Sequence, residues 1–283
     1  MTNPPVLDPR FLATAIEAVV RAGEMQMARF GSDIRVEKKG AIDLVTEVDV
    51  EVETMLRALI EQRFPGHDVL AEEMGQPRTG ATHRWVFDPL DGTTNYAHGV
   101  PIFCSTLALE IDGQPTVGAV FDPNRRELFT VERGVGAWMN GQPLRVSSSA
   151  TLNDSLLVTG FPYDVRTRMD EVLTLFAAFL QEARAVRRLG SAAIDLCWVA
   201  AGRLDGFWEQ GLQSWDTMAG ALMVQEASGR VTALDGGAWN PHGGRVLASN
   251  GHIHEAMVAV IRDTKTRKVA QTRGNYGGRT ANS

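Results

Sequence analysis

The stretch FDPLDGTTNYAHG spans residues 87–99 and places two aspartates, Asp88 and Asp91, three residues apart around a proline. An apolar run at residues 85–88 predicts a strand that ends at Asp88, so that Asp91 lies at the same rim of the sheet. Two carboxylates this close raise each other's pKa unless a cation neutralises them. Because the candidate ligands are all oxygens, the pattern favours magnesium over zinc.

The residues after Asp91 suit an anion. Gly92 permits a close approach of the backbone, and a helical turn that begins at Thr93 would leave free amides facing outward. A metal ion and a phosphate group would then meet at one point. Asp-Pro and Asp-Gly are also ordinary turn formers, so this stretch alone leaves a purely structural role open.

Three further acidic positions are candidates for the same site. Glu72 follows a predicted strand at residues 68–71 and could bind a metal, although glutamates in this position are commonly solvated. Asp216 lies at a predicted helix start, where an aspartate is often only an N-cap. Asp49 ends DLVTEVD (residues 43–49), which is also explained by a strand followed by a cap.

The first half of the chain predicts helices on a meander sheet. Asp8 and Pro9 indicate the start of a helix whose apolar periodicity extends to Gly31. A second helix is expected after Thr46, ending before Pro65. Between residues 104 and 146, apolar runs are separated by Asp-Gly, Pro-Asn and Asn-Gly, which is typical of antiparallel hairpins.

The second half predicts alternating strands and helices, and hence a layered α/β unit. The expected strands lie at residues 156–159, 185–187, 205–208 and 246–249. The expected helices lie at residues 171–182, 192–201, 217–227 and 254–263. The chain is therefore divided into an N-terminal unit (1–146) with most candidate ligands, a C-terminal unit (147–265) and a polar, mobile tail (266–283).

Composition restricts the class of protein. A chain of 283 residues favours two subdomains, and its formal net charge of -6 argues against general binding to nucleic acid or anionic membranes. Cys104 and Cys197 lie in apolar segments and are predicted to be reduced core residues. The N-terminus lacks a signal-peptide or membrane-span pattern, so the cytoplasm is the expected location.

Four segments occur in a family-specific order: DLVTEVD, AEE, WVFDPLDGTTN and EQGLQSWDTMAG. Together with RRLGSAAIDLCWVAAGRLDGFWEQG, they make the chain resemble the inositol monophosphatase family from about Phe11 to about Ile261. The resemblance implies a layered α-β-α-β-α sandwich of the sugar phosphatase type, an α/β (α+β) fold. It also implies lithium-sensitive hydrolysis of a phosphate monoester with two or three Mg²⁺ ions, usually by a homodimer.

The resemblance also implies metal ligands. Glu72, Asp88 and the carbonyl of Leu90 match ligands of the first ion. Asp88, Asp91 and Asp216 match ligands of the second ion, so that Asp88 would bridge the two.

Catalytic and phosphate-binding roles are implied in the same way. Asp49 and Thr93 match the pair that orients and deprotonates the attacking water, and Glu72 is grouped with them. The amides of Gly92 and Thr93 should hold phosphate oxygens. Lys38 matches a basic residue near the site, although the adjacent Lys39 leaves the register open.

Substrate residues follow from the resemblance too. Glu209 matches a residue that binds ring hydroxyls, unless it is only the polar end of the strand at 205–208. Gly190, Ser191 and Ala192 match the loop that lines this pocket, together with Asp216. Inositol monophosphate is the favoured substrate, and other sugar or polyol phosphates, including fructose 1,6-bisphosphate, are alternatives. A scaffold or regulatory protein with a binding role is the alternative from a different class.

Some features are assigned no role in catalysis. The two histidines of residues 252–254 are predicted to lie on the surface, and residues 134–136 are predicted to form a turn. Arg187 and Arg188 could contact substrate, a dimer partner or only water.

Overall fold

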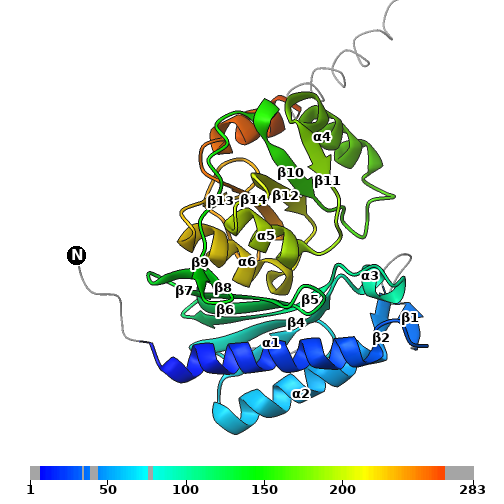
Figure 1. Cartoon of the computed structure of the whole chain (residues 1–283), viewed down its shortest axis with the longest axis vertical. Coiled ribbons are helices and arrows are strands. Elements are labelled where there is room, and N and C mark those ends of the chain that lie inside the picture. The colour runs from blue at the N-terminus through cyan, green and yellow to red at the C-terminus, as the bar shows by residue number, and fades with distance from the viewer. Residues whose placement is uncertain (1–6, 34, 39–43, 76–78, 265–283) are drawn as a thin grey trace, which may run out of the picture.

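The computed structural model describes residues 7–33, 35–38, 44–75 and 79–264. Figure 1 shows five layers: α1 and α2, a first sheet, α5 and α6, a second sheet, and an outer helical layer that contains α4. This order confirms the predicted α-β-α-β-α sandwich. None of the described helices is both long and apolar enough to span a membrane.

The outer layer next to the first sheet consists of α1 (Pro9–Arg29) and α2 (Glu47–Arg63). Asp8 caps α1, because its side chain accepts a hydrogen bond from the Arg10 amide at 2.9 Å. Thr46 and Asp49 form a capping box at the start of α2, which follows β2 (Leu44–Thr46). The predicted starts of both helices are confirmed. β2 pairs with the exposed strand β1 (Val36–Lys38).

Seven strands form the first sheet in the order β3-β4-β5-β6-β7-β8-β9, and only β3 and β4 run parallel. The predicted antiparallel hairpins are confirmed, and so is the predicted turn near residues 134–136. The strands are β3 (Asp68–Ala71), β4 (His83–Asp91), β5 (Cys104–Ile111), β6 (Gln114–Asp122), β7 (Glu127–Glu132), β8 (Gly136–Met139) and β9 (Gln142–Pro143).

The predicted end of β4 at Asp88 is wrong. The strand continues to Asp91, and its register with β5 shifts between the two aspartates. Two residues between Asp88 and Asp91 oppose a single residue between Thr106 and Cys104, which is a β-bulge. The bulge accommodates Pro89, which has no amide proton for the ladder.

The second sheet has the order β11-β10-β12-β14-β13. β11, β10 and β12 run parallel to one another, and β14 runs antiparallel to both of its neighbours, β12 and β13. A 3₁₀ turn (Leu152–Asp154) precedes it. The strands are β10 (Leu156–Thr159), β11 (Ala185–Arg187), β12 (Gly206–Gln210), β13 (Arg230–Thr232) and β14 (Arg245–Ser249). β13 was not predicted, because a run of three residues with an exposed arginine carries little periodicity.

Helices α5 (Ala192–Ala200) and α6 (Ser214–Glu226) fill the space between the sheets and are apolar on most sides. Their close approach depends on Gly220, where an added Cβ would lie 2.6 Å from the Leu196 Cβ. Cys104 and Cys197 are buried and free, as predicted. α4 (Met169–Glu182) and the helical residues 254–264 cover the other face of the second sheet (Figure 1).

The predicted surface position of His254 is wrong. Its ring is fully buried and lies 2.9 Å from the hydroxyls of both Thr232 and Ser249. Because both ring nitrogens have partners, burial leaves no polar atom of the ring unsatisfied. His252 is exposed, as expected.

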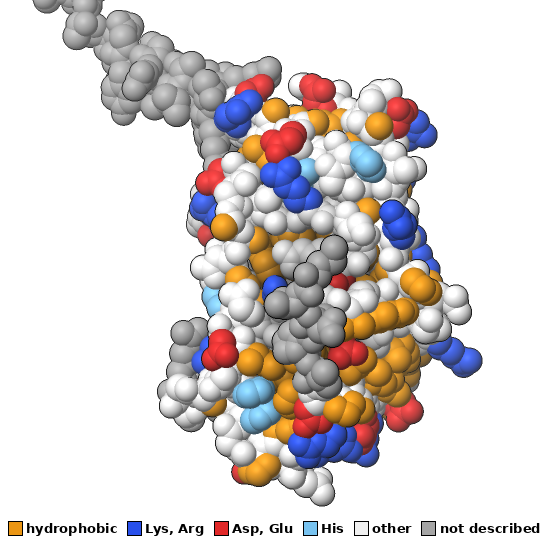
Figure 2. Space-filling model, turned by 90° about the vertical axis from the view of Figure 1, so that its left-hand side faces the viewer, with side chains coloured by type: hydrophobic (Ala, Val, Ile, Leu, Met, Phe, Trp, Pro, Cys, Tyr) orange, Lys and Arg blue, Asp and Glu red, His pale blue; other side chains and the backbone are white. Residues whose placement is uncertain are grey.

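Charged side chains of both signs are interspersed on the face drawn in Figure 2, with hydrophobic groups between them. The division of the chain at residue 146 stays a prediction. The expected tail at 266–283, like Lys39, lies outside the described residues.

Candidate active site

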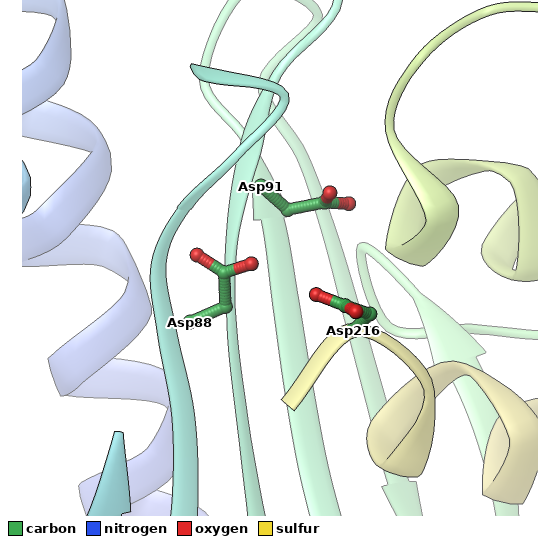
Figure 3. Close-up of side chains that lie close together, drawn as sticks. All are labelled: Asp88, Asp91 and Asp216. Carbon is green, nitrogen blue, oxygen red and sulfur yellow. The ribbon is translucent and has the colours of Figure 1, made fainter. Parts of the chain in front are cut away.

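Three aspartates converge where the first sheet meets α6. Asp88 and Asp91 come from the bulged end of β4, and Asp216 comes from the first turn of α6. Their side chains point toward one another in Figure 3, and one carboxylate oxygen from each lies within 4.8 Å of the others. Asp88 and Asp91 are buried, and Asp216 is partly buried.

This cluster is electrostatically unfavourable by itself. Burial, together with repulsion from Glu72, Asp91 and Asp216, raises the pKa of Asp88 well above its ordinary range. Burial raises the pKa of Asp91 to about 6, although hydrogen bonds from Ser191 and the Ala193 amide oppose the shift. The pKa of Asp216 is raised well above its ordinary range by burial and by repulsion from Asp91. Buried carboxylates that repel one another fit a site completed by cations, and oxygen donors fit magnesium.

Each of the three carboxylates accepts a hydrogen bond, and Asp88 accepts from the Leu90 amide at 2.8 Å. Asp91 accepts from the Ser191 hydroxyl at 2.6 Å and from the Ala193 amide at 2.8 Å, which ties β4 to the start of α5. Asp216 accepts from the Gln213 amide at 2.7 Å as the third helical residue of a capping box. Asp216 therefore caps α6 from inside the helix and belongs to the acidic cluster as well.

A second group of predicted residues lies beside the cluster. The Thr93 hydroxyl donates to the Leu90 carbonyl at 2.9 Å and lies 3.4 Å from a carboxylate oxygen of Asp49. The other oxygen of Asp49 accepts from the Thr46 amide at 2.8 Å. The structure thus brings together two residues that are 44 positions apart in the sequence. Glu72, in the turn after β3, lines the same cleft.

Gly92 makes the turn into α3 (Thr93–Ala97) possible. Its φ of 97° lies in the left-handed region, and a Cβ there would lie 2.8 Å from the Ile102 carbonyl oxygen. The predicted helical turn at Thr93 is therefore confirmed. Gly92 and Thr93 both line the cleft.

The cleft has a volume of about 420 Å³. Glu209 also lines this cleft and is only 7% exposed, and burial raises its pKa to about 8 despite the opposing effects of Arg188 and the Gly160 amide. A Cβ at Gly160 would lie 2.1 Å from Glu209 Oε1, so glycine at this position leaves room for the carboxyl group where it now lies. The predicted loop residues also line the cleft: Gly190, Ser191 and Ala192.

Two predicted residues do not line this cleft. Asp49 is fully buried behind Thr93. Lys38 is exposed on β1. Arg188, whose role the sequence left open, does line the cleft, with its guanidinium 5.8 Å from the centre of the Phe161 ring.

Sequence reasoning missed several residues of the site. Gln26 donates to the Pro89 carbonyl at 2.7 Å and so stabilises the bulge from the side of the sheet that α1 covers. Asp195 lines the cleft from α5, four residues after Ser191. The available signal for Asp195 was a carboxylate in an otherwise apolar helix, one turn after a predicted substrate loop. Phe161, Tyr163 and Trp215 also contribute to the walls of the cleft.

Comparison with known proteins agrees with this geometry. The inositol monophosphatase family model matches residues 8–266. The inositol-1-monophosphatase of Synechocystis sp. is 44% identical over 266 residues, covering 92% of this chain and 93% of that protein. The solved inositol monophosphatase of Anabaena (Nostoc) sp. is 40% identical, with a TM-score of 0.82 and coverage of 90% and 96%. The Nus factor SuhB of Escherichia coli is 40% identical over 255 residues, covering 89% of this chain and 96% of that protein.

The fold and these similarities define a phosphatase. The chain belongs to the inositol monophosphatase family.

Proposed function

We propose that this phosphatase hydrolyses myo-inositol monophosphate to inositol and phosphate in a magnesium-dependent reaction. The observation that carries the proposal is the convergence of Asp88, Asp91 and Asp216 within 4.8 Å, in a cleft that also contains Glu209. The three aspartates at one part of the cleft suit cations that bind a phosphate group. Glu209 in the cleft wall suits the hydroxyl groups of the organic part of the substrate. Relatives named inositol-1-monophosphatase support the substrate.

The proposed metal ligands are oxygen atoms only. Glu72, Asp88 and the Leu90 carbonyl would hold one Mg²⁺ ion, and Asp88, Asp91 and Asp216 would hold another, in a site of two or three ions. Bound magnesium would shield the phosphate charge and lower the pKa of water at the site. Magnesium fits this site because the buried carboxylates repel one another and a cation would relieve that repulsion.

Asp49 and Thr93 are proposed to move the proton of the attacking water. With the Leu90 carbonyl engaged by magnesium, the Thr93 hydroxyl would turn its single proton from that carbonyl to Asp49, which lies 3.4 Å away, and would accept a hydrogen bond from water. The Thr46 amide donates to the other carboxylate oxygen of Asp49 at 2.8 Å and so holds this carboxylate in position to receive the proton. Glu72 would border the same water.

The remaining residues are proposed to orient the substrate. The amides of Gly92 and Thr93 would donate to phosphate oxygens where negative charge must be stabilised. Glu209 would contact ring hydroxyls, and with a pKa of about 8 it retains a proton at neutral pH and can both donate and accept. Gly190, Ser191, Ala192 and Asp216 would complete the pocket.

A phosphate-release assay with and without magnesium tests the proposal. We expect release from inositol monophosphate with Mg²⁺ and a loss of at least about a hundredfold after chelation. Other sugar phosphates and fructose 1,6-bisphosphate belong in the same panel as alternative substrates. Undiminished release in the presence of a chelator would exclude the proposed role of the aspartates.

A second candidate function is regulatory binding, which the similarity to a protein named Nus factor SuhB favours. A binding role would survive the loss of turnover. It would therefore persist in an Asp216→Asn variant that no longer releases phosphate.

Three further properties are proposed from the family similarity. Lithium should inhibit by occupying a magnesium site after hydrolysis, which an inhibition series at fixed magnesium would test. The protein should be a homodimer, which sedimentation would test. It should act in the cytoplasm on a small phosphate monoester, without general binding to nucleic acid, which cell fractionation and a filter-binding assay would test.

A further inference from the structure

Asp195 is an unexplained carboxyl group in the wall of the cleft. It is 1% exposed, and its Oδ1 atom has no hydrogen-bond partner within the described part of the chain. A buried polar atom without a hydrogen-bond partner destabilises the folded protein. An unpaired carboxyl group is therefore a stability defect that a bound ligand could relieve.

The position of Asp195 on α5 directs it toward the substrate end of the cleft. Asp195 lies four residues after Ser191 and three after Ala192, so the three side chains share one face of the helix start. All three line the cleft together with Glu209. Asp195 lies outside the cluster formed by Asp88, Asp91 and Asp216.

We propose that Asp195 is a specificity residue, and that Asp195 and Glu209 form a two-carboxyl wall that receives adjacent hydroxyl groups of a neutral polyol phosphate. The inference rests on the proposed function and specifies its substrate class further. A hydroxyl group both donates and accepts, so it can form a hydrogen bond with the Asp195 carboxyl group in either proton state.

The charges around the wall support a neutral polyol. Burial, with repulsion from Glu209 and Asp91, raises the pKa of Asp195 well above its ordinary range. The raised pKa values favour the neutral form of both carboxyl groups, and the nearby Arg188 guanidinium repels an ammonium group. The wall therefore suits uncharged hydroxyl groups better than a cationic group.

The test replaces Asp195 and compares two substrates. Asp195→Leu keeps the branched shape but removes hydrogen bonding, and p-nitrophenyl phosphate offers no hydroxyl on its leaving group. We expect the ratio of kcat/KM for inositol 1-phosphate to kcat/KM for p-nitrophenyl phosphate to fall about tenfold or more. Most of the change should lie in KM for the inositol substrate.

Three controls separate specificity from folding. Asp195→Asn, which can still donate and accept, should restore part of the ratio. Asp170→Leu, on the exposed first turn of α4, should leave the ratio unchanged. The thermal midpoint of Asp195→Leu should equal or exceed that of the wild type, because an unsatisfied buried group is removed.

The outcomes are distinguishable. An unchanged ratio in Asp195→Leu overturns the inference, as do equal losses of turnover on both substrates with a lowered thermal midpoint. If the wild-type protein releases phosphate from neither substrate, the proposed function itself fails and the inference falls with it.

Discussion

At the scale of single residues, the bulge in β4 explains how Asp88 and Asp91 meet. Side chains three residues apart in a regular strand point to opposite faces of the sheet. The extra residue in the bulge restores both aspartates to the same side. The Leu90 amide donates to Asp88 at 2.8 Å, and Gln26 of α1 donates to the Pro89 carbonyl, so hydrogen bonds from within the bulge and from a distant helix fix the irregular backbone.

Thr93 offers a direct test of the proposed proton path. Thr93→Ala removes one hydroxyl and leaves every carboxylate of the acidic cluster in place, so we expect turnover to fall by about a hundredfold or more. The magnesium concentration for half-maximal activity should change little. Thr93→Ser, which keeps the hydroxyl, should retain most activity; equal losses in both variants would contradict the path.

His254 predicts a pH dependence of stability. Burial, with repulsion from Arg230, lowers its pKa from an ordinary value of 6.5 to about 4, although Glu255 opposes the shift. Between these values the unfolded chain binds a proton that the folded protein excludes, so stability falls as the pH decreases from about 6.5 to about 4. At about 1.4 kcal/mol per pKa unit, the loss amounts to at most ~3.5 kcal/mol.

The measurement is the free energy of unfolding of wild type and His254→Gln across this pH range. The wild-type advantage over His254→Gln should shrink as the pH falls. His252→Gln, at an exposed position two residues away, should follow the wild-type curve. Parallel curves for wild type and His254→Gln would rule out the effect.

At the scale of elements, α5 and α6 form the layer between the two sheets and also position residues of the active site. α5 holds Asp91 through Ser191, and α6 supplies Asp216. The spacing between these helices therefore sets the distance between residues of the active site. Gly220 fixes that spacing, because its missing Cβ lets Leu196 approach.

Gly220→Ala tests this dependence. The added Cβ would lie 2.6 Å from Leu196 Cβ, so we expect a loss of about 1–3 kcal/mol in the free energy of unfolding, accompanied by lower turnover. Gly237→Ala is the matched control, since its close neighbour is the mobile end of the exposed Asp235 side chain. Wild-type stability and activity in Gly220→Ala would show that the layer can absorb the extra volume.

At the scale of the whole molecule, the sequence predicted the helices and strands better than the tertiary contacts between them. Caps, apolar periodicity and turn dipeptides located α1, α2 and the hairpins, because these signals are local. The bulge at Pro89, the burial of His254 and the role of Gln26 depend on partners far away in the chain. Local patterns do not report such partners.

The candidate site shows the same division. The family resemblance gave the acidic residues, Thr93 and Glu209, and all of these except Asp49 line the cleft. Asp195 was missed because a single carboxylate in an apolar helix has no pattern of its own. Its exposure to the cleft depends on how α5 lies against β12, which only the assembled fold determines.

The central claim is that Asp88, Asp91 and Asp216 form one magnesium site for phosphate hydrolysis. The most direct measurement is phosphate release from inositol monophosphate by Asp216→Asn at saturating magnesium, with the thermal midpoint followed with and without the metal. The account predicts a loss of turnover of about a hundredfold or more and a smaller stabilisation by magnesium. It also predicts a metal-free thermal midpoint no lower than that of the wild type, because repulsion among the carboxylates is relieved. Near-normal turnover with an unchanged response to magnesium would contradict it.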